Sequence, residues 1–245
     1  GYDGIEAGLP EGKALDGLLT LLARRRLRLI AWIETIGPGV DDHIESFRRQ
    51  AEQAASVRPV LINSHSAADR LTFAEQITFF QHALDIETRL GIPVAHETHR
   101  GRPTYTPWNT AALLQALPDL KLTMDVSHWI CVCERLPDDC LSELLLAASK
   151  TLHLHARVGY EQGPQVPDPR APEYARQVAW HERYWRDIVQ ARQTSGHEVL
   201  TVTPEYGPPD YLHTLPGTRQ PVADLWDVCL WAAERARSQW TSEKG

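Results

Sequence analysis

The chain has 245 residues, and its 25 Lys and Arg against 32 Asp and Glu give a formal net charge of −7. Hydrophobic residues make up 42% and charged residues 23%, an ordinary composition for a globular protein, and we expect one domain over residues 1–245. The negative charge argues against partners held through their phosphates, which are nucleic acids and anionic membranes, and no apolar run approaches the ~20 residues of a membrane span.

Seven short apolar runs follow one another along the chain, each closed by a polar residue. They cover residues 4–7, 27–35, 59–64, 93–98, 121–127, 151–157 and 199–205. The closing residues are Glu6, Glu34, His65, Glu97, Asp125, His155 and Glu205. Most successive closing residues lie about 30 residues apart, the size of one βα unit. The one long interval holds the proline-rich segment 159–174, which predicts a long loop ahead of a helix.

Stretches with helical spacing separate these runs. Residues 71–90 place their apolar side chains on one side of a helix, and Gly91 stands where that helix would stop. A second helix is expected over 111–117, entered through Thr106-Pro107. The alternation predicts parallel strands and favours a (β/α)8 barrel, with one strand fewer here, over a doubly wound open sheet. An open sheet would not require a polar residue at the end of each strand.

Strand side chains alternate between two faces, so the position of a residue within its run predicts its direction. His153, His155 and Arg157 share one face, as do Trp32 with Glu34 and Asn63 with His65. The apolar faces must pack under the helices, so the polar faces look into the barrel. Active sites of such barrels lie at the carboxyl ends of the strands.

Three carboxylates and one imidazole meet at four successive strand ends: Glu97, Asp125, His155 and Glu205. Crowded carboxylates repel each other unless a cation lies among them. We therefore expect one divalent ion per chain, with Mn²⁺ or Mg²⁺ favoured by the oxygen-rich ligand set and Zn²⁺ or Co²⁺ as alternatives.

At these residues the chain resembles the xylose-isomerase-like barrels, a superfamily of sugar isomerases, ketose 3-epimerases, hydroxypyruvate isomerases, inosose dehydratases and endonuclease IV. The matching stretches are residues 1–6 (GYDGIE), 63–65 (NSH), 96–100 (HETHR), 124–129 (MDVSHW), 152–157 (LHLHAR) and 203–207 (TPEYG). The resemblance implies the same four metal ligands, with Glu97 and Glu205 also serving as the acid/base pair. It also implies a substrate contact for His128.

The chain departs from this pattern in two ways. Superfamily barrels begin with a strand ahead of the GYDGIE stretch, so we expect seven strands, an open seam and a further N-terminal βα unit in the native gene. Endonuclease IV proteins carry extra zinc-binding histidines, which Trp32-Ile-Glu34 and Asp168-Pro-Arg170 do not supply. Together with the net charge, this argues against a DNA-repair enzyme. The loop arginine of the epimerases has no match at its usual spacing, and Arg157 and Arg170 are the candidates to replace it.

The sequence thus predicts a metal-dependent isomerase or epimerase acting on a keto sugar or related polyol. Alternatives are a lyase or dehydratase of the inosose or 3-keto-glycoside type, and a non-catalytic sugar-binding barrel. The predicted substrate contacts are His128, His65, Arg157, Glu34 and Trp32. Trp108 and Trp129 also lie near strand ends, where an indole could stack on a sugar ring.

Other features bear on the surroundings of the protein. His96 is expected to face the helices and His99 to orient a loop. Sparse cysteine, with Cys131, Cys133 and Cys140 matching no common zinc finger, favours a reducing compartment and the cytoplasm. The expected partner is a small sugar, without nucleic acid or membrane, and a homo-oligomer remains open.

Overall fold

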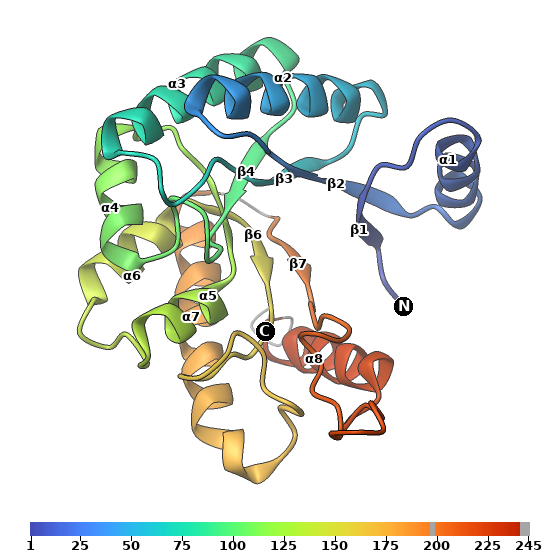
Figure 1. Cartoon of the computed structure of the whole chain (residues 1–245). Helices are drawn as coiled ribbons and strands as arrows, with labels where there is room; N and C mark the ends of the chain where they lie inside the picture. The colour runs from blue at the N-terminus through green and yellow to red at the C-terminus, as the bar shows by residue number, and fades with distance from the viewer. Residues whose placement is uncertain (197–198, 241–245) are drawn as a thin grey trace.

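The computed structural model describes residues 1–196 and 199–240. In these residues seven parallel strands form one sheet whose spatial order follows the chain. They are β1 (Gly4–Gly8), β2 (Arg28–Glu34), β3 (Leu61–His65), β4 (Val94–Glu97), β5 (Leu122–Met124), β6 (Thr151–His155) and β7 (Thr201–Thr203). The strands curl into a nearly closed barrel (Figure 1). The predicted seven-stranded barrel is confirmed.

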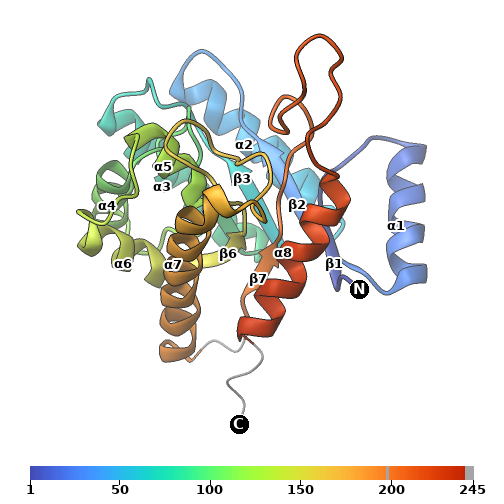
Figure 2. The same cartoon turned by 90° about the horizontal axis from the view of Figure 1, so that it is seen from below.

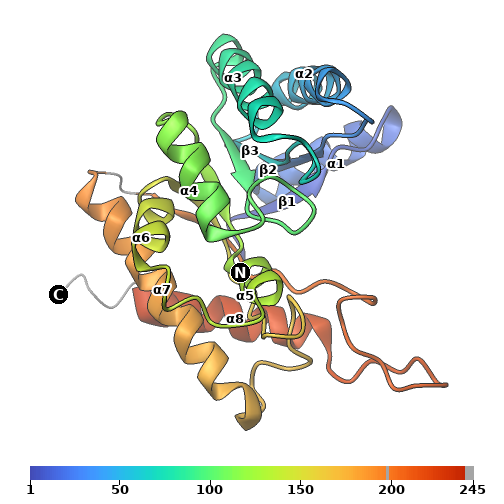
Figure 3. The ribbon, with the colours of Figure 1, turned by 60° about the vertical axis from the view of Figure 1, so that its left-hand side comes forward.

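Helices follow the strands and lie outside them (Figures 1 and 3). They are α1 (Lys13–Arg25), α2 (Val40–Ser56), α3 (Phe73–Leu90), α4 (Pro107–Ala116), α5 (Val126–Cys133), α6 (Leu141–Ser149), the short 3-10 helix η1 (Pro172–Tyr174), α7 (Ala175–Thr194) and α8 (Leu225–Trp240). In the described part of the chain, no helix is long and apolar enough to cross a membrane.

Local sequence signals explain where α3 and α4 begin and end. The Thr72 side chain accepts a hydrogen bond from the Glu75 backbone N–H, and the Glu75 carboxylate accepts one from the Thr72 backbone N–H. Gly91 ends α3 with φ of 66°, the left-handed conformation that glycine adopts most easily. Thr106 caps α4, with Pro107 as its first residue. Both predicted helices are confirmed.

The hydrophobic core lies between the barrel and its helices. Phe47 of α2 and Phe79 and Phe80 of α3 have no exposed surface, and their rings meet edge to face. Leu154 of β6 belongs to the same core, whereas its neighbour His155 points into the barrel toward Glu6 and Glu205. The predicted alternation of faces is confirmed for this strand.

The seam between β1 and β7 carries no backbone ladder in the described residues, because β1 pairs with β2 and β7 with β6. Side chains cross the seam instead. Thr203 Oγ1 donates to Glu6 Oε2 over 2.7 Å. Helix α8 contacts the segment ahead of β1, next to the N-terminus (Figure 2), where the rings of Tyr2 and Trp226 meet edge to face at 6.0 Å.

Candidate metal centre

The four predicted metal ligands come together at the carboxyl ends of β4, β5, β6 and β7. Each of Glu97, Asp125, His155 and Glu205 offers a ligand atom within 4.8 Å of the others. Glu97 is the last residue of β4, Asp125 follows β5 and caps α5, His155 ends β6, and Glu205 follows β7. The barrel register therefore joins residues that are up to 108 positions apart in sequence.

His155 lies at the centre of this group. Its Nε2 is 3.0 and 3.1 Å from the two oxygens of Glu6, and because a carboxylate only accepts, Nε2 carries the proton. Its Nδ1 lies 2.7 Å from Glu205 Oε2 and 3.7 Å from Glu97 Oε1. Nδ1 and Glu205 Oε2 are both buried; they form an ion pair when the ring is protonated, but neither makes an aligned hydrogen bond. A cation beside these two atoms would satisfy both of them, so the ligand set fits a metal ion.

The protonation of His155 depends on the same carboxylates. Burial lowers the pKa of His155, but Glu6, Glu205 and Glu97 outweigh burial and hold this pKa well above its usual value. Without a cation, the surrounding carboxylates therefore favour a positively charged imidazole. Metal binding requires the neutral ring and would release that proton.

Glu97 is ionised although only 2% of the residue is exposed. Burial raises the pKa of Glu97, whereas the imidazoles of His155 and His65 lower it well below the usual range. Its Oε2 accepts a hydrogen bond from Asn63 Nδ2 over 2.8 Å and lies 2.9 Å from His65 Nε2. These contacts fix the carboxylate facing the barrel axis.

Arg157 supplies a permanent positive charge beside Asp125 and Glu205. The buried guanidinium donates to Asp125 Oδ2 through Nη2 and to Glu205 Oε1 through Nη1. Asp125 Oδ1 accepts from the Ser127 backbone N–H over 3.0 Å. Burial raises the pKa of Asp125 to about 6, against the lowering effect of the Arg157 guanidinium. Asp125 is thus the one predicted ligand whose two oxygens both have partners already, and metal coordination would use their remaining lone pairs.

The predicted substrate contacts surround this group on two sides. Trp32 meets the His65 ring edge to face at 5.2 Å, and both lie on the β2–β3 side. The Glu34 carboxylate is paired with Arg102. His128 is fully buried, and its Nε2 accepts from Arg157 Nη2 over 2.7 Å. The role of each in substrate binding stays a prediction.

Four further polar residues belong to the centre and were not among the predicted site residues: Glu6, Asn63, His153 and Thr203. Asn63 Nδ2 donates to both Glu6 Oε1 and Glu97 Oε2, over 2.7 and 2.8 Å. His153 Nε2 lies 3.1 Å from Glu6 Oε2. All four residues have the inward position in their strands, which is the signal that could have found them. Asn63, His153 and Thr203 share the Glu6 carboxylate as a partner, which is visible only in the folded barrel.

Several expectations outside the ligand set are decided by the structure. The expectation that Trp129 could stack on a sugar is wrong. Its ring has no exposed surface, and its Nε1 donates to the Thr104 carbonyl over 2.8 Å. His96 faces the helices as predicted, against Phe47 and Phe80. Arg157 and Arg170 were the candidates to replace the loop arginine of the epimerases. Arg157 lies in the centre, whereas Arg170 pairs with Asp168 outside it.

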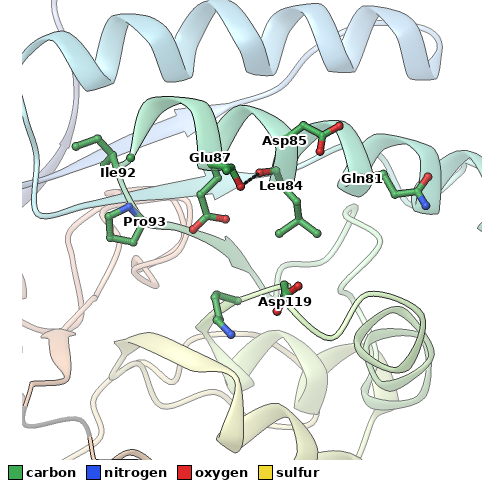
Figure 4. Close-up of a pocket in the computed structure, with 10 residues that line it drawn as sticks. Gln81, Leu84, Asp85, Glu87, Ile92, Pro93 and Asp119 are labelled. Atoms are coloured by element: carbon green, nitrogen blue, oxygen red, sulfur yellow. Dashed lines mark hydrogen bonds between the residues drawn. The ribbon is translucent and has the colours of Figure 1, made fainter.

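A surface groove lies at the opposite end of the barrel from these residues. Its lining includes Gln81, Leu84 and Glu87 of α3, together with Pro93 and Asp119 near the starts of β4 and β5 (Figure 4). The Val94 backbone N–H donates to Glu87 there. The groove shares no residue with the candidate metal centre.

No protein-family model matches the chain, and no curated protein matches it in sequence. Among solved structures, a xylose isomerase-like TIM barrel protein from Mycobacterium smegmatis in complex with magnesium is similar, with a TM-score of 0.65 and 14% identity over 99% of this chain and 85% of that one. A 3-keto-D-glucoside 4-epimerase from E. coli is similar with a TM-score of 0.56 and 12% identity, over 97% of this chain and 90% of that one. A probable 3-DHS dehydratase from Bacillus anthracis is similar with a TM-score of 0.54 and 15% identity, over 93% of this chain and 82% of that one. The chain therefore has the fold of the xylose isomerase-like TIM barrels.

Proposed function

We propose that this protein is a divalent-metal-dependent enzyme that moves a proton next to the carbonyl of a keto sugar or related polyol. The observation that carries the proposal is the ligand set of three carboxylates and one imidazole, in which three of the four residues are buried. In this set His155 Nδ1 and Glu205 Oε2 lie 2.7 Å apart, and neither makes an aligned hydrogen bond. An oxygen-rich set of this kind suits Mn²⁺ or Mg²⁺.

A divalent cation held by Glu97, Asp125, His155 and Glu205 would supply positive charge to the substrate oxygens and to the negative charge that develops beside the carbonyl. The protein's own part is to keep the ligands ionised and oriented. Arg157 neutralises Asp125 and Glu205, while Glu6 holds the Nε2 proton of His155 and so aims Nδ1 at the ligand set.

Glu97 and Glu205 are suited to act as an acid/base pair because they approach the centre from different strands. Their carboxylates both lie near His155 Nδ1, at 3.7 Å for Glu97 and 2.7 Å for Glu205, with two strands, β5 and β6, between their own. In the proposed reaction one glutamate takes the proton beside the carbonyl, and the other returns a proton to the opposite face, which inverts the carbon. The Glu205 side chain is 31% exposed against 2% for Glu97, so Glu205 is the more open to a substrate.

The structural neighbours support this class of chemistry, since one is a 3-keto-D-glucoside 4-epimerase and another a probable 3-DHS dehydratase. Elimination begins with the same proton removal as epimerisation. A dehydratase or lyase is therefore the second candidate, and identification of the product separates the two.

Metal binding is the first test. Elemental analysis of protein purified without chelator, followed by calorimetric titration with Mn²⁺, should show binding by the wild type. Asp125→Ala should lose most of the affinity. Equal binding by both proteins would refute the proposed ligand set.

Proton transfer is the second test. With a panel of keto sugars in heavy water, the wild type should incorporate deuterium beside the carbonyl. Glu97→Gln and Glu205→Gln each keep an oxygen ligand but delete a base, so exchange should fall by at least ~10²-fold. Near-wild-type exchange in both variants would show that the glutamates are ligands only. No exchange with any substrate would favour a sugar-binding barrel.

A further inference from the structure

Arg100 brings a guanidinium without a carboxylate partner to the mouth of the barrel, where the strands end. It lies three residues after the end of β4 and is exposed. We propose that Arg100 binds an oxyanion of the substrate, which is then an acidic keto sugar or polyol that carries a carboxylate or a phosphate group. The proposal rests on the proposed function, because it names the substrate class of the same centre.

The other arginines in the segments that follow β4 and β6 already have acidic partners. The pairs are Arg102 with Glu34, Arg157 with Asp125 and Glu205, and Arg170 with Asp168. Among the described residues, Arg100 forms no ion pair with an Asp or Glu side chain. Its polar neighbour is the Cys131 thiol, a weak acceptor that leaves most of the guanidinium N–H groups free for a ligand.

Tyr211, which follows β7, joins this guanidinium to the candidate metal centre. Arg100 Cζ lies 5.4 Å from the centroid of the Tyr211 ring, and Arg157 Cζ lies 4.8 Å from the same centroid. Arg157 donates to both Asp125 and Glu205. A single aromatic ring therefore spans the distance between Arg100 and the arginine that contacts two of the candidate ligands.

Hydrogen bonds hold the two segments that present Arg100 and Tyr211. Arg102, two residues after Arg100, donates through Nη1 to the Ala67 carbonyl over 2.7 Å. The Tyr211 backbone N–H donates to the Pro208 carbonyl over 2.8 Å. A loop that is already ordered loses little conformational freedom when it binds a ligand, which favours affinity.

The chemistry of the guanidinium selects the ligand. Its planar fork of N–H donors matches the two oxygens of a carboxylate or phosphate group. Arg157 does not have this capacity to spare, because its Nη1 and Nη2 donate to Glu205, Asp125 and His128. In a chain of net charge −7, an exposed cation beside the centre would attract an anionic substrate.

Three polyols that share one six-carbon chain test the proposal: neutral D-glucitol, D-gluconate with a terminal carboxylate, and D-glucitol 6-phosphate. Each is titrated by calorimetry into Mn²⁺-loaded and into chelator-treated full-length protein. The wild type should bind at least one of the two anions ~10-fold more tightly than D-glucitol, the scale of hydrogen bonds to a charged group. The anion that binds more tightly identifies carboxylate or phosphate as the group that Arg100 recognises.

Arg100→Gln should lose this preference and keep its affinity for D-glucitol, whereas Arg100→Lys, which retains the charge without the planar fork, should keep part of it. Arg24→Gln is the matched control, because Arg24 is exposed in the last turn of α1, and it should bind all three compounds like the wild type.

A wild type that binds neither anion more tightly than D-glucitol would overturn the inference. So would a preference that Arg100→Gln retains, which is the result expected if the anion binds to the metal alone. The chelator-treated protein separates this inference from the proposed function. If the protein binds no Mn²⁺ but Arg100→Gln still loses the preference for the anion, the proposed metal-dependent function fails and the anion site stands.

Discussion

Glu6→Gln should weaken metal binding although Glu6 is not itself a proposed ligand. The Glu6 carboxylate lies 3.0 Å from His155 Nε2, and it accepts hydrogen bonds from Asn63 over 2.7 Å and from Thr203 over 2.7 Å. An amide offers one oxygen instead of two and turns an N–H₂ group toward these donors. The ring of His155 would then lose the partner that aims Nδ1 at Glu97, Asp125 and Glu205.

The size of the effect follows from this contact. Loss of a residue that orients a metal-binding histidine typically costs about 10–100-fold in metal affinity, which corresponds to about 1.4–2.8 kcal/mol of binding free energy. The change also leaves buried donors without partners, at about 1–3 kcal/mol each in folding free energy. Binding must therefore be measured on protein whose circular dichroism and melting curve show that it is folded.

The assay is calorimetric titration of wild type, Glu6→Gln and Glu45→Gln with Mn²⁺. Glu45 is the control carboxylate, because it lies on the surface of α2 with 63% of its side chain exposed and pairs with Arg48. We expect weaker binding by Glu6→Gln alone. Folded Glu6→Gln with wild-type affinity would refute the idea that Glu6 orients His155 for a metal.

Three further predictions concern stability and partners. Gly159→Ala should destabilise the protein by about 1–3 kcal/mol, because its Cβ would lie 2.7 Å from Ser127 Cβ and 3.0 Å from Ser127 backbone atoms. Gly17→Ala, in open space within α1, should be neutral or stabilising in the same urea titration. Burial lowers the pKa of His96 to about 3, so below its unfolded pKa of about 6.5 the unfolded chain binds a proton that the folded protein does not. The free energy of unfolding should therefore fall as pH drops from about 6.5 toward 3, and His96→Gln should lose stability less steeply between pH 7 and 4.5; an identical slope would contradict this. With a net charge of −7, binding to abasic-site DNA at micromolar protein should be undetectable in a mobility-shift assay at physiological salt, and salt-dependent submicromolar binding or strand incision would instead favour a nuclease.

The barrel and the meeting of the four candidate ligands could be predicted from the sequence because both depend on local regularities. A βα unit has a nearly fixed length, and strand side chains alternate, so the polar residue that closes each run must appear at one end of the barrel and point inward. Glu97, Asp125, His155 and Glu205 follow from these rules and from the resemblance. The residues at which the strands end were predicted less accurately from the sequence. In the run 121–127 the strand stops at Met124, because the Asp125 side chain accepts from the Ser127 backbone N–H and begins α5.

The tertiary structure alone decided which groups hold the candidate ligands in place. Glu6 and His155 are 149 residues apart and meet only because the barrel brings β1 beside β6 and β7. Trp129 lies just past a strand end, yet the packing of α5 buries its ring in the core. His99 looked like a loop residue in the sequence, and its place against His65 depends on the path of the loop after β4. Such contacts depend on the curvature and closure of the whole sheet, and no local pattern of residues encodes that geometry.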